Sequence, residues 1–357
     1  MKPGTHPAIA SRDARLLAVD GTGVTHLARA GFPSLLRPHD LVIANDAATL
    51  PASLAGTHGP TGEVVEVRLA GRRSLDPLSA RRFLAIVFGT GDYRTPTEHR
   101  LAPPALAIGD EFRFPDHGGS GAVAVRPALA RVLEILGHPR LVELEFSGTI
   151  DEIWHGVATA GRPVQYSYVP EPLAIWDTWT RVAAKPVAFE APSAGFLLDW
   201  SMLRAIRARG ARFATITHAA GLSSTGDPEL DRRLPFDEPY DIPGATAALI
   251  ARTRHAGGRI IAIGTTVVRA LESASDGHGG VQPGAGLATM RLGPGSPVSV
   301  VDAIVSGMHE AGTSHYELLK AFAADSALEE MNAEAEASGY LAHEFGDFMF
   351  VEHRRVA

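Results

Sequence analysis

The hydrophobic residues of this chain follow two different patterns. In the first, short apolar runs are continuous, as expected of strands buried on both faces of a sheet, and segments with helical spacing lie between them. The runs cover residues 16–19, 40–46, 212–217, 259–263 and 298–306. Strands that alternate with helices in this way predict an α/β domain with a mainly parallel sheet.

The second pattern begins at about Thr61 and ends at Phe146. Short segments there alternate apolar and polar residues or are rich in β-branched residues, at 63–69, 82–88, 111–114, 131–136 and 141–146. The last two flank a four-residue loop, Gly137 to Arg140, which predicts a hairpin. Such strands, separated by turn signals, predict a small antiparallel β-barrel.

Because βα units occur on both sides of it, we expect the barrel to be inserted into the larger domain. The predicted division is an α/β domain of residues 1–55 and 148–357 and a β-barrel domain of residues 56–147. Helices are expected at 149–160, 198–209, 245–256, 267–274 and 313–324, a return strand at 25–27 and a final strand at 348–351.

The stretch Gly257 to Glu272 contains the clearest candidate for a ligand site. A buried strand, 259–263, is followed by Gly264, which allows a sharp turn, and by Thr265 or Thr266, either of which is a good helix cap. Such a turn directs free N–H groups to the carboxyl edge of a sheet, where anions bind. Arg269 is expected in the first helical turn; the alternative is an ordinary βα unit in which it pairs with Glu272.

Polar residues follow the other buried strands as well. Asn45 and Asp46 end one strand, His218 ends another, and His309 follows the run that ends at Ser306. Carboxyl ends of parallel strands share one edge of the sheet, so these side chains are expected to converge with Thr265, Thr266 and Arg269. The alternative for each histidine is an ordinary surface or core position. His309 and His315 have poor helical spacing for metal ligands, and we predict no metal site.

The segment Gly161 to Trp179 is rich in proline and aromatic residues, among them Tyr166, Trp176 and Trp179. It predicts an extended loop packed on a core. The alternative is a stacking surface for a nucleic-acid base.

Composition sets limits on these interpretations. The 357 residues are enough for two domains, and the net charge of −7 argues against nucleic-acid binding by bulk charge while allowing a local basic patch. No cysteine is present, which excludes disulfides, thiolate nucleophiles and zinc–sulfur sites. No signal-peptide block or 18-residue apolar run occurs, so we expect a cytoplasmic enzyme without a membrane span. The sequence leaves the oligomeric state open, with a monomer favoured.

A series of motifs resembles the S-adenosylmethionine:tRNA ribosyltransferase-isomerases, the family that makes the queuosine precursor. The motifs occur in family order over most of the chain. They are SRDARLLAVD, LLRPHDLVIAND, LPASLAG, TGEVVEVRL, APSAGF, the strand ending in His218, the Glu238–Tyr240 pair, GTTVVRALES, Val301-Asp302-Ala303 leading to His309, and Phe345-Gly346-Asp347.

The resemblance implies an α/β domain interrupted by a β-barrel. It implies transfer of the ribosyl part of S-adenosylmethionine, the co-substrate, to the 7-aminomethyl-7-deazaguanine base of a tRNA anticodon, giving epoxyqueuosine and releasing adenine and methionine. No metal is implied. This chemistry needs a base and an acid, roles that histidine fills near pH 7. The implied catalytic residues are His218, His309 and Asp46; the S-adenosylmethionine site is Gly264, Thr265, Thr266, Arg269, Ser193 and Gly195; the substrate site is Asn45, Glu238, Tyr240 and Tyr166.

The chain also departs from the family pattern. Leu197 stands where the family has a histidine in a Gly-Leu-His-Phe-Thr run, and Ser53 stands where it has an arginine. The Pro-Pro-Tyr segment is Arg162 to Tyr166, and the Tyr-Gln-Thr-Val-Tyr run is Trp179 to Ala183. These changes predict that S-adenosylmethionine binding is retained while tRNA recognition is weaker or altered.

Three alternatives follow. A divergent relative would use S-adenosylmethionine on a different acceptor. A non-catalytic protein would bind a nucleoside or RNA without releasing adenine. A methyltransferase is disfavoured, because the start of the chain lacks a glycine-rich first βα turn.

Overall fold

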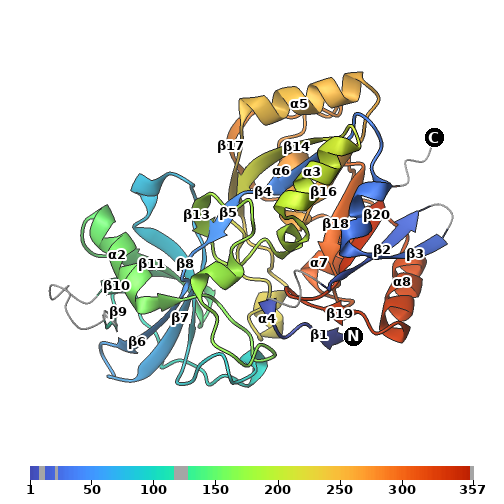
Figure 1. Cartoon of the computed structure of the whole chain (residues 1–357). Helices are drawn as coiled ribbons and strands as arrows, with labels where there is room; N and C mark the ends of the chain where they lie inside the picture. The colour runs from blue at the N-terminus through green and yellow to red at the C-terminus, as the bar shows by residue number, and fades with distance from the viewer. Residues whose placement is uncertain (8–12, 21–22, 116–127, 354–357) are drawn as a thin grey trace.

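The computed structural model describes residues 1–7, 13–20, 23–115 and 128–353. Two bodies lie side by side in Figure 1, a β-barrel on the left and a larger α/β body on the right. Within the described residues, no helix has the length and apolar character needed to cross a membrane.

A nine-stranded sheet forms the α/β body. The strands in spatial order are β17 (Gly284–Ala288), β15 (Glu238–Ile242), β14 (Arg212–His218), β4 (Leu41–Asn45), β16 (Ile260–Ile263), β18 (Ala303–Gly307), β20 (Phe348–Glu352), β2 (Arg15–Asp20) and β3 (Gly23–Ala28). The four strands β14, β4, β16 and β18 are parallel to one another. The predicted parallel α/β sheet is therefore confirmed, and its carboxyl edge is the edge where the polar residues were expected.

The central strands are apolar throughout because alternate residues enter two different cores. Leu41 and Ile43 pack in one core with α5 (Gly244–His255), α6 (Thr265–Ser273), α7 (Ser314–Leu319) and α8 (Asp325–Ala337). Val42 and Ala44 face the opposite core with Phe32 of the 3-10 turn η1 (Arg29–Leu35) and α3 (Trp200–Ala208). Both faces of the sheet are thus covered, as continuous apolar strands require.

The predicted inserted barrel is confirmed as a closed antiparallel barrel of six strands. They run in the order β6 (Ser53–His58), β7 (Val64–Gly71), β8 (Arg82–Phe88), β11 (Leu141–Phe146), β10 (Ala128–His138) and β9 (Glu111–Phe114). Pairing of β9 with the end of β6 at Thr57 and His58 closes the ring, and β12 (Gly161–Arg162) pairs with the start of β6 at Ser53 and Leu54. Phe83, Phe114 and Phe146 fill its core with edge and stacked ring contacts.

The two bodies are joined by α2 (Ile150–Ala160) and by a short parallel pair, β5 (Ala47–Thr49) with β13 (Lys185–Ala188). In Figure 1 this pair lies between the barrel and the large sheet. The remaining short elements are β1 (Lys2–Pro3), β19 (Leu341–Ala342), α4 (Pro228–Asp231) and the 3-10 turns η2 (Pro77–Ser79), η3 (Thr97–His99), η4 (Ile175–Thr178) and η5 (Ser193–Leu197).

Three details differ from the sequence predictions. The hairpin loop is shorter than four residues, because β10 continues to His138 through two register shifts and Gly137 adopts a positive φ of 67°. The buried run 298–306 becomes a strand only at residue 303. Before that point the carboxylate of Glu272 accepts the N–H groups of Val300 and Val301, so these groups do not need a neighbouring strand as their hydrogen-bond partner. Helix α8 was missed; only a narrow stripe of it, including Leu328 and Met331, is buried.

The N-terminus of α2 gives a test of these local rules. Thr149 caps the helix by accepting the N–H of Glu152, whose carboxylate in turn accepts the N–H of Thr149. Thr149→Ala should lower the free energy of unfolding by about 1 kcal/mol in urea titrations. Thr159→Ala on the same helix is the matched control, because its hydroxyl only bonds backward to a helix carbonyl. Equal effects of the two changes would contradict the capping role.

Candidate functional site

A cavity of about 310 Å³ opens at the carboxyl ends of the central parallel strands. All of its lining residues come from the part of the α/β body that follows the barrel in the sequence. The lining residues are Glu190, Ala191, Pro192, Ser193, Ala194, Ala220, Gly221, Leu222, Ser223, Asp231, Arg232, Leu234, Pro235, Glu238, Gly264, Thr265, Thr266, Arg269, Arg291, Leu292, Ser306, Gly307, His309, Gly312, Ser314, His315, Glu317 and Leu318. Of the residues expected at a site, Ser193, Glu238, Gly264, Thr265, Thr266, Arg269 and His309 line this cavity.

The start of α6 forms one wall. Gly264 is the N-cap residue, with φ of +97° and no side-chain cap, so the prediction that Thr265 or Thr266 caps the helix is wrong. The N-cap position has a positive φ, which threonine rarely adopts. Thr265 and Thr266 therefore follow the cap and already belong to the helix. The first N–H groups of a helix have no partner within it, and here they belong to residues that line the cavity. This end of α6 is suited to bind an anion.

Arg269 lies in the second turn of α6, not the first, because the helix begins at Thr265. Its guanidinium forms a buried ion pair with Glu238 and donates to the carbonyl oxygens of Ala288 (2.8 Å) and Phe236 (3.1 Å). The alternative pairing with Glu272 is wrong, since that carboxylate accepts backbone N–H groups instead. Most of the hydrogen-bonding capacity of Arg269 is therefore used within the protein.

Glu238 and His218 form the layer next to Arg269. Glu238 also accepts the N–H of Gly221, and the Nε2 atom of His218 lies 3.5 Å from the Glu238 carboxylate. Burial raises the pKa of Glu238, and Arg269 opposes that effect. Burial, and then the charge of Arg269, hold the pKa of His218 well below its usual range. His218 is fully buried and lies behind Glu238, outside the cavity lining.

His309 and His315 stack against each other on another part of the lining, with ring centroids 4.6 Å apart and planes 13° from parallel. The Nε2 atom of His309 lies 3.1 Å from the hydroxyl of Ser306. Burial, followed by the neighbouring His315 and His343, holds the pKa of His309 well below its usual range. Burial and Arg269 lower the pKa of His315 to about 4. Both imidazoles are therefore neutral at pH 7 and available as bases or hydrogen-bond partners.

The sequence suggests no role for His315 beyond the rejected metal site. It is six positions from His309, but the loop before α7 brings the two rings together, a proximity that helical spacing does not reveal. Among the residues that the structure describes, no group of three or more histidine, aspartate or glutamate side chains is arranged to hold a metal ion.

Glu190 lines the cavity and was not singled out from the sequence. Its carboxylate accepts a hydrogen bond from the hydroxyl of Tyr166 and another from the N–H of Ser223 (3.0 Å). Burial raises its pKa to about 7, helped by Glu344 and opposed by the bond from Tyr166. Glu190 comes two residues after β13, whose first half is exposed, so the sequence lacks the continuous apolar run that drew attention to Asn45 and His218.

Other expected site residues support the cavity from behind. Asn45 fixes the end of β14 through two hydrogen bonds to the backbone of His218, at 2.8 and 2.9 Å. Tyr166 is buried beneath Glu190. Gly195 lies where an added Cβ would come within 2.8 Å of Thr180, so its place is set by packing.

The side chains of Asp46 and Tyr240 make their contacts outside the cavity. The Asp46 carboxylate accepts hydrogen bonds from the hydroxyls of Thr217 (2.6 Å) and Thr215 (3.1 Å), and it does not line the cavity. Tyr240 is buried, with its ring packed over Gly286. The structure thus brings together the residues around α6 and His309, but not these two.

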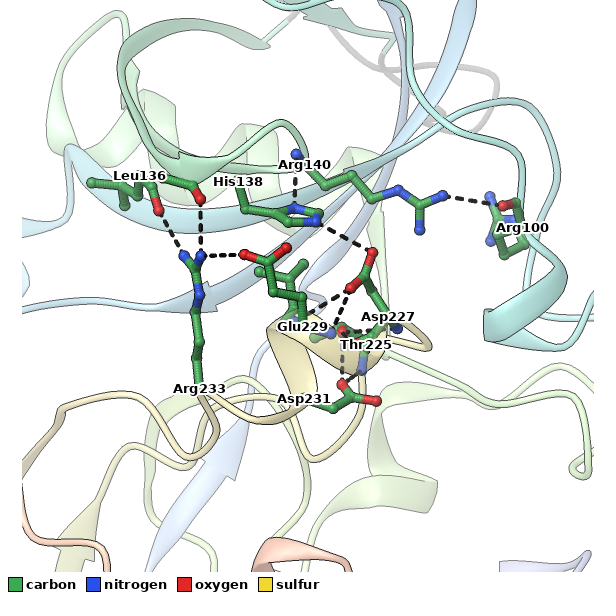
Figure 2. A network of polar contacts seen from close by, with 11 residues as sticks. Arg100, Leu136, His138, Arg140, Thr225, Asp227, Glu229, Asp231 and Arg233 are labelled. Carbon is green, nitrogen blue, oxygen red and sulfur yellow. Dashed lines mark hydrogen bonds and ion pairs between the residues drawn. The ribbon is translucent and has the colours of Figure 1, made fainter.

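The barrel holds one wall of the cavity in place. Figure 2 shows Arg233 donating to the carbonyl oxygens of Leu136 and Gly137 at the end of β10, and His138 pairing with Asp227 at 3.3 Å. Asp227 caps α4, and Asp231 at the end of this helix lines the cavity. The barrel therefore positions part of the site.

The fold and this cavity define an α/β protein with an inserted β-barrel and a concave site suited to a ligand with an anionic group. The family model described as "Queuosine biosynthesis protein" matches residues 3–351. The chain therefore belongs to the queuosine biosynthesis protein family.

Individual relatives agree with this assignment. The S-adenosylmethionine:tRNA ribosyltransferase-isomerase of Gloeobacter violaceus is 32% identical over 355 residues, which cover 97% of this chain and 91% of that protein. The protein of the same name from Dechloromonas aromatica is 31% identical over 354 residues, 97% of this chain and 92% of the relative. A crystal structure of an S-adenosylmethionine tRNA ribosyltransferase from Thermotoga maritima covers 98% of this chain and 95% of that one, with 19% identity and a TM-score of 0.48; the assignment does not depend on it.

The buried pair of Arg269 and Glu238 gives a second test. Arg269→Met leaves Glu238 as an uncompensated buried charge and should lower the free energy of unfolding by about 3–5 kcal/mol. Adding Glu238→Gln removes that charge and should restore much of the loss. Chemical denaturation of the single and double variants measures the coupling. Additive losses would show that the two side chains are not a functional pair.

Proposed function

We propose that this protein transfers and isomerises the ribosyl moiety of S-adenosylmethionine onto the aminomethyl group of 7-aminomethyl-7-deazaguanine in tRNA. The products are epoxyqueuosine in tRNA, adenine and methionine. Relatives that carry the name of this activity cover nearly the whole chain, which supports the proposal. The observation that carries it is a single cavity that combines a helix N-terminus with two groups suited to proton transfer, His309 and Glu190.

In this proposal the N-terminus of α6 binds the carboxylate of S-adenosylmethionine. The N–H groups of Thr265 and Thr266, with the helix dipole, stabilise a negative charge without needing a further cation. Arg269 contributes indirectly, because it neutralises Glu238 and fixes the strand that carries it. Ser193 on the facing loop lines the same cavity and supplies a hydroxyl to the ligand.

His309 is the proposed base. The reaction needs a group that removes a proton beside the sulfonium, and a neutral imidazole with a free ring nitrogen does so. Its environment favours that form, since burial and two neighbouring histidines disfavour a positive charge. Stacking on His315 and the contact with Ser306 orient the ring.

Glu190 is the proposed acid that protonates the departing adenine. A carboxyl group with a pKa of about 7 keeps a proton to donate near neutral pH. Tyr166 and Ser223 fix its orientation. The charged and titratable groups around it include Tyr166, Tyr168, Glu344 and, beyond Tyr166, Arg68.

In this proposal the protein recognises tRNA through the anticodon loop, acts as a monomer and is located in the cytoplasm. It also divides the chain at about residues 56 and 147, so that the barrel positions the cavity wall and offers surface for the tRNA. Roles for His218 and Asn45 are then supporting ones, since both lie behind the lining.

A direct test is incubation of the protein with S-adenosylmethionine and tRNA that carries the 7-aminomethyl-7-deazaguanine base, followed by chromatography for free adenine. We expect adenine release that depends on this tRNA. Ligand binding without adenine would identify a non-catalytic binding protein. Equal release with tRNA lacking the modified base would identify a different acceptor.

The pH dependence of turnover tests the two proton-transfer roles. Activity should fall on the acid side at a pH below 6.5, where His309 becomes protonated, and on the alkaline side near pH 7, where Glu190 loses its proton. Tyr166→Phe removes a hydrogen bond that favours the carboxylate, so the pKa of Glu190 rises and the alkaline limb should move to higher pH. Glu190→Gln should lower kcat by about 10²–10⁴.

Tyr240→Phe is the control for this series, since Tyr240 is buried but does not line the cavity. Its pH profile should match that of the parent. An alkaline limb that stays in place in Tyr166→Phe would rule out Glu190 as the acid.

A further inference from the structure

A second hollow lies apart from the cavity, beside α2 and the proline-rich segment 161–179. We call it the tryptophan groove; its volume is about 560 Å³. Its lining is almost wholly apolar or aromatic and includes three tryptophans, Trp154, Trp176 and Trp179. Among the residues that the structure describes, Arg162 is the only charged one that lines it.

Two of these rings are unusually exposed. Trp176 is 72% exposed and Trp179 is 43% exposed, although large apolar side chains normally avoid water. Hydrogen bonds to the backbone hold the segment that carries both rings. The indole N–H of Trp179 donates to the carbonyl oxygen of Thr49 (3.0 Å), and Asp177 accepts the N–H of Ala174 (2.9 Å) to fix the turn that carries Trp176. The groove is therefore a preformed aromatic surface.

We propose that the tryptophan groove binds an unpaired base of the tRNA substrate, which stacks on Trp176 and Trp179 next to the base that reacts in the cavity. This inference rests on the proposed function and adds a location for RNA recognition. Aromatic side chains that stack on splayed-out bases are the usual way in which proteins bind single-stranded RNA loops.

The charge at the groove fits this ligand. The side chain of Arg162 is exposed at the groove and forms no ion pair within the described part of the chain. A guanidinium beside stacking rings is placed to contact the phosphate that follows a stacked base. In a chain with a net charge of −7, such a local cation matters more than the overall charge.

The position of the groove relative to the cavity also fits. Pro186 of β13 lines the groove, and Glu190, four residues further on, lines the cavity. Extended backbone advances about 3.3 Å per residue and the strand ends at Ala188, so these two lining residues are separated by at most about 13 Å of chain. β5 runs parallel to it and brings Thr49 to the groove. Adjacent nucleotides of an unpaired loop can span such a distance.

The test uses the full-length protein and Trp176→Ala. Binding of a fluorescein-labelled anticodon stem-loop RNA is followed by anisotropy at fixed salt, and steady-state kinetics are measured with tRNA. We expect RNA binding to weaken by about 5- to 100-fold and KM for tRNA to rise, while kcat and S-adenosylmethionine affinity stay unchanged. Trp176→Phe keeps an aromatic face and should recover most of the binding.

The matched control is Trp200→Ala. Trp200 is also 72% exposed but begins α3 and does not line the groove, so its removal should leave RNA binding unchanged. Arg162→Gln should reduce the slope of log affinity against log salt by about one, as expected for one lost phosphate contact.

Two results would overturn the inference. One is RNA binding by Trp176→Ala equal to that of Trp200→Ala. The other is a concentration-dependent dimer in sedimentation that Trp176→Ala dissolves, which would make the groove a contact between two copies. If the parent protein releases no adenine with tRNA, the proposed function fails; if it does and Trp176→Ala matches the control, only the groove assignment fails.

Discussion

The buried ion pair between Arg269 and Glu238 is the constraint on which the site depends. It forms part of the cavity lining and joins α6, β15 and the loop at Gly221. Charges at this depth are costly unless they are paired and fully hydrogen-bonded, and here Arg269 also satisfies three carbonyl oxygens. Burial is the main cause of the lowered pKa values of His315 and His218, and the positive charge of Arg269 adds to it. One pair thus fixes the geometry of the α6 wall and helps to keep the histidines near it neutral.

The local sequence patterns predict most of the fold. A continuous apolar run indicates a strand buried on both faces of a sheet, and an alternating run indicates a strand buried on one face. The convergence of polar residues at strand ends follows from the parallel sheet, and it leads correctly to Thr265 and His309 at the cavity. Spacing does not predict which way a strand-end side chain points. Asp46 follows directly after Asn45, yet it is turned to the threonines of β14. Glu190 shows the reverse case, in which a strand-end residue was overlooked.

The departures from the family pattern have physical explanations in the structure. Leu197, at the place of a family histidine, is buried in the core against α3, so that position packs instead of binding. Ser53, at the place of an arginine, donates to Glu66, whose carboxylate is paired with Arg68 and Arg100. Positive charge is therefore still present there, supplied from β7 and from Arg100. Pairings between distant residues of this kind cannot be predicted from one sequence.

The central claim is that one cavity, at the N-terminus of α6, binds S-adenosylmethionine between Glu190 and His309. A crystal structure with the unreactive sulfide analogue S-adenosylhomocysteine tests this most directly. We expect the amino-acid carboxylate of the ligand at the N–H groups of Thr265 and Thr266, with the adenine within hydrogen-bonding reach of Glu190. Density for the ligand in the tryptophan groove, or with its carboxylate away from α6, would contradict it.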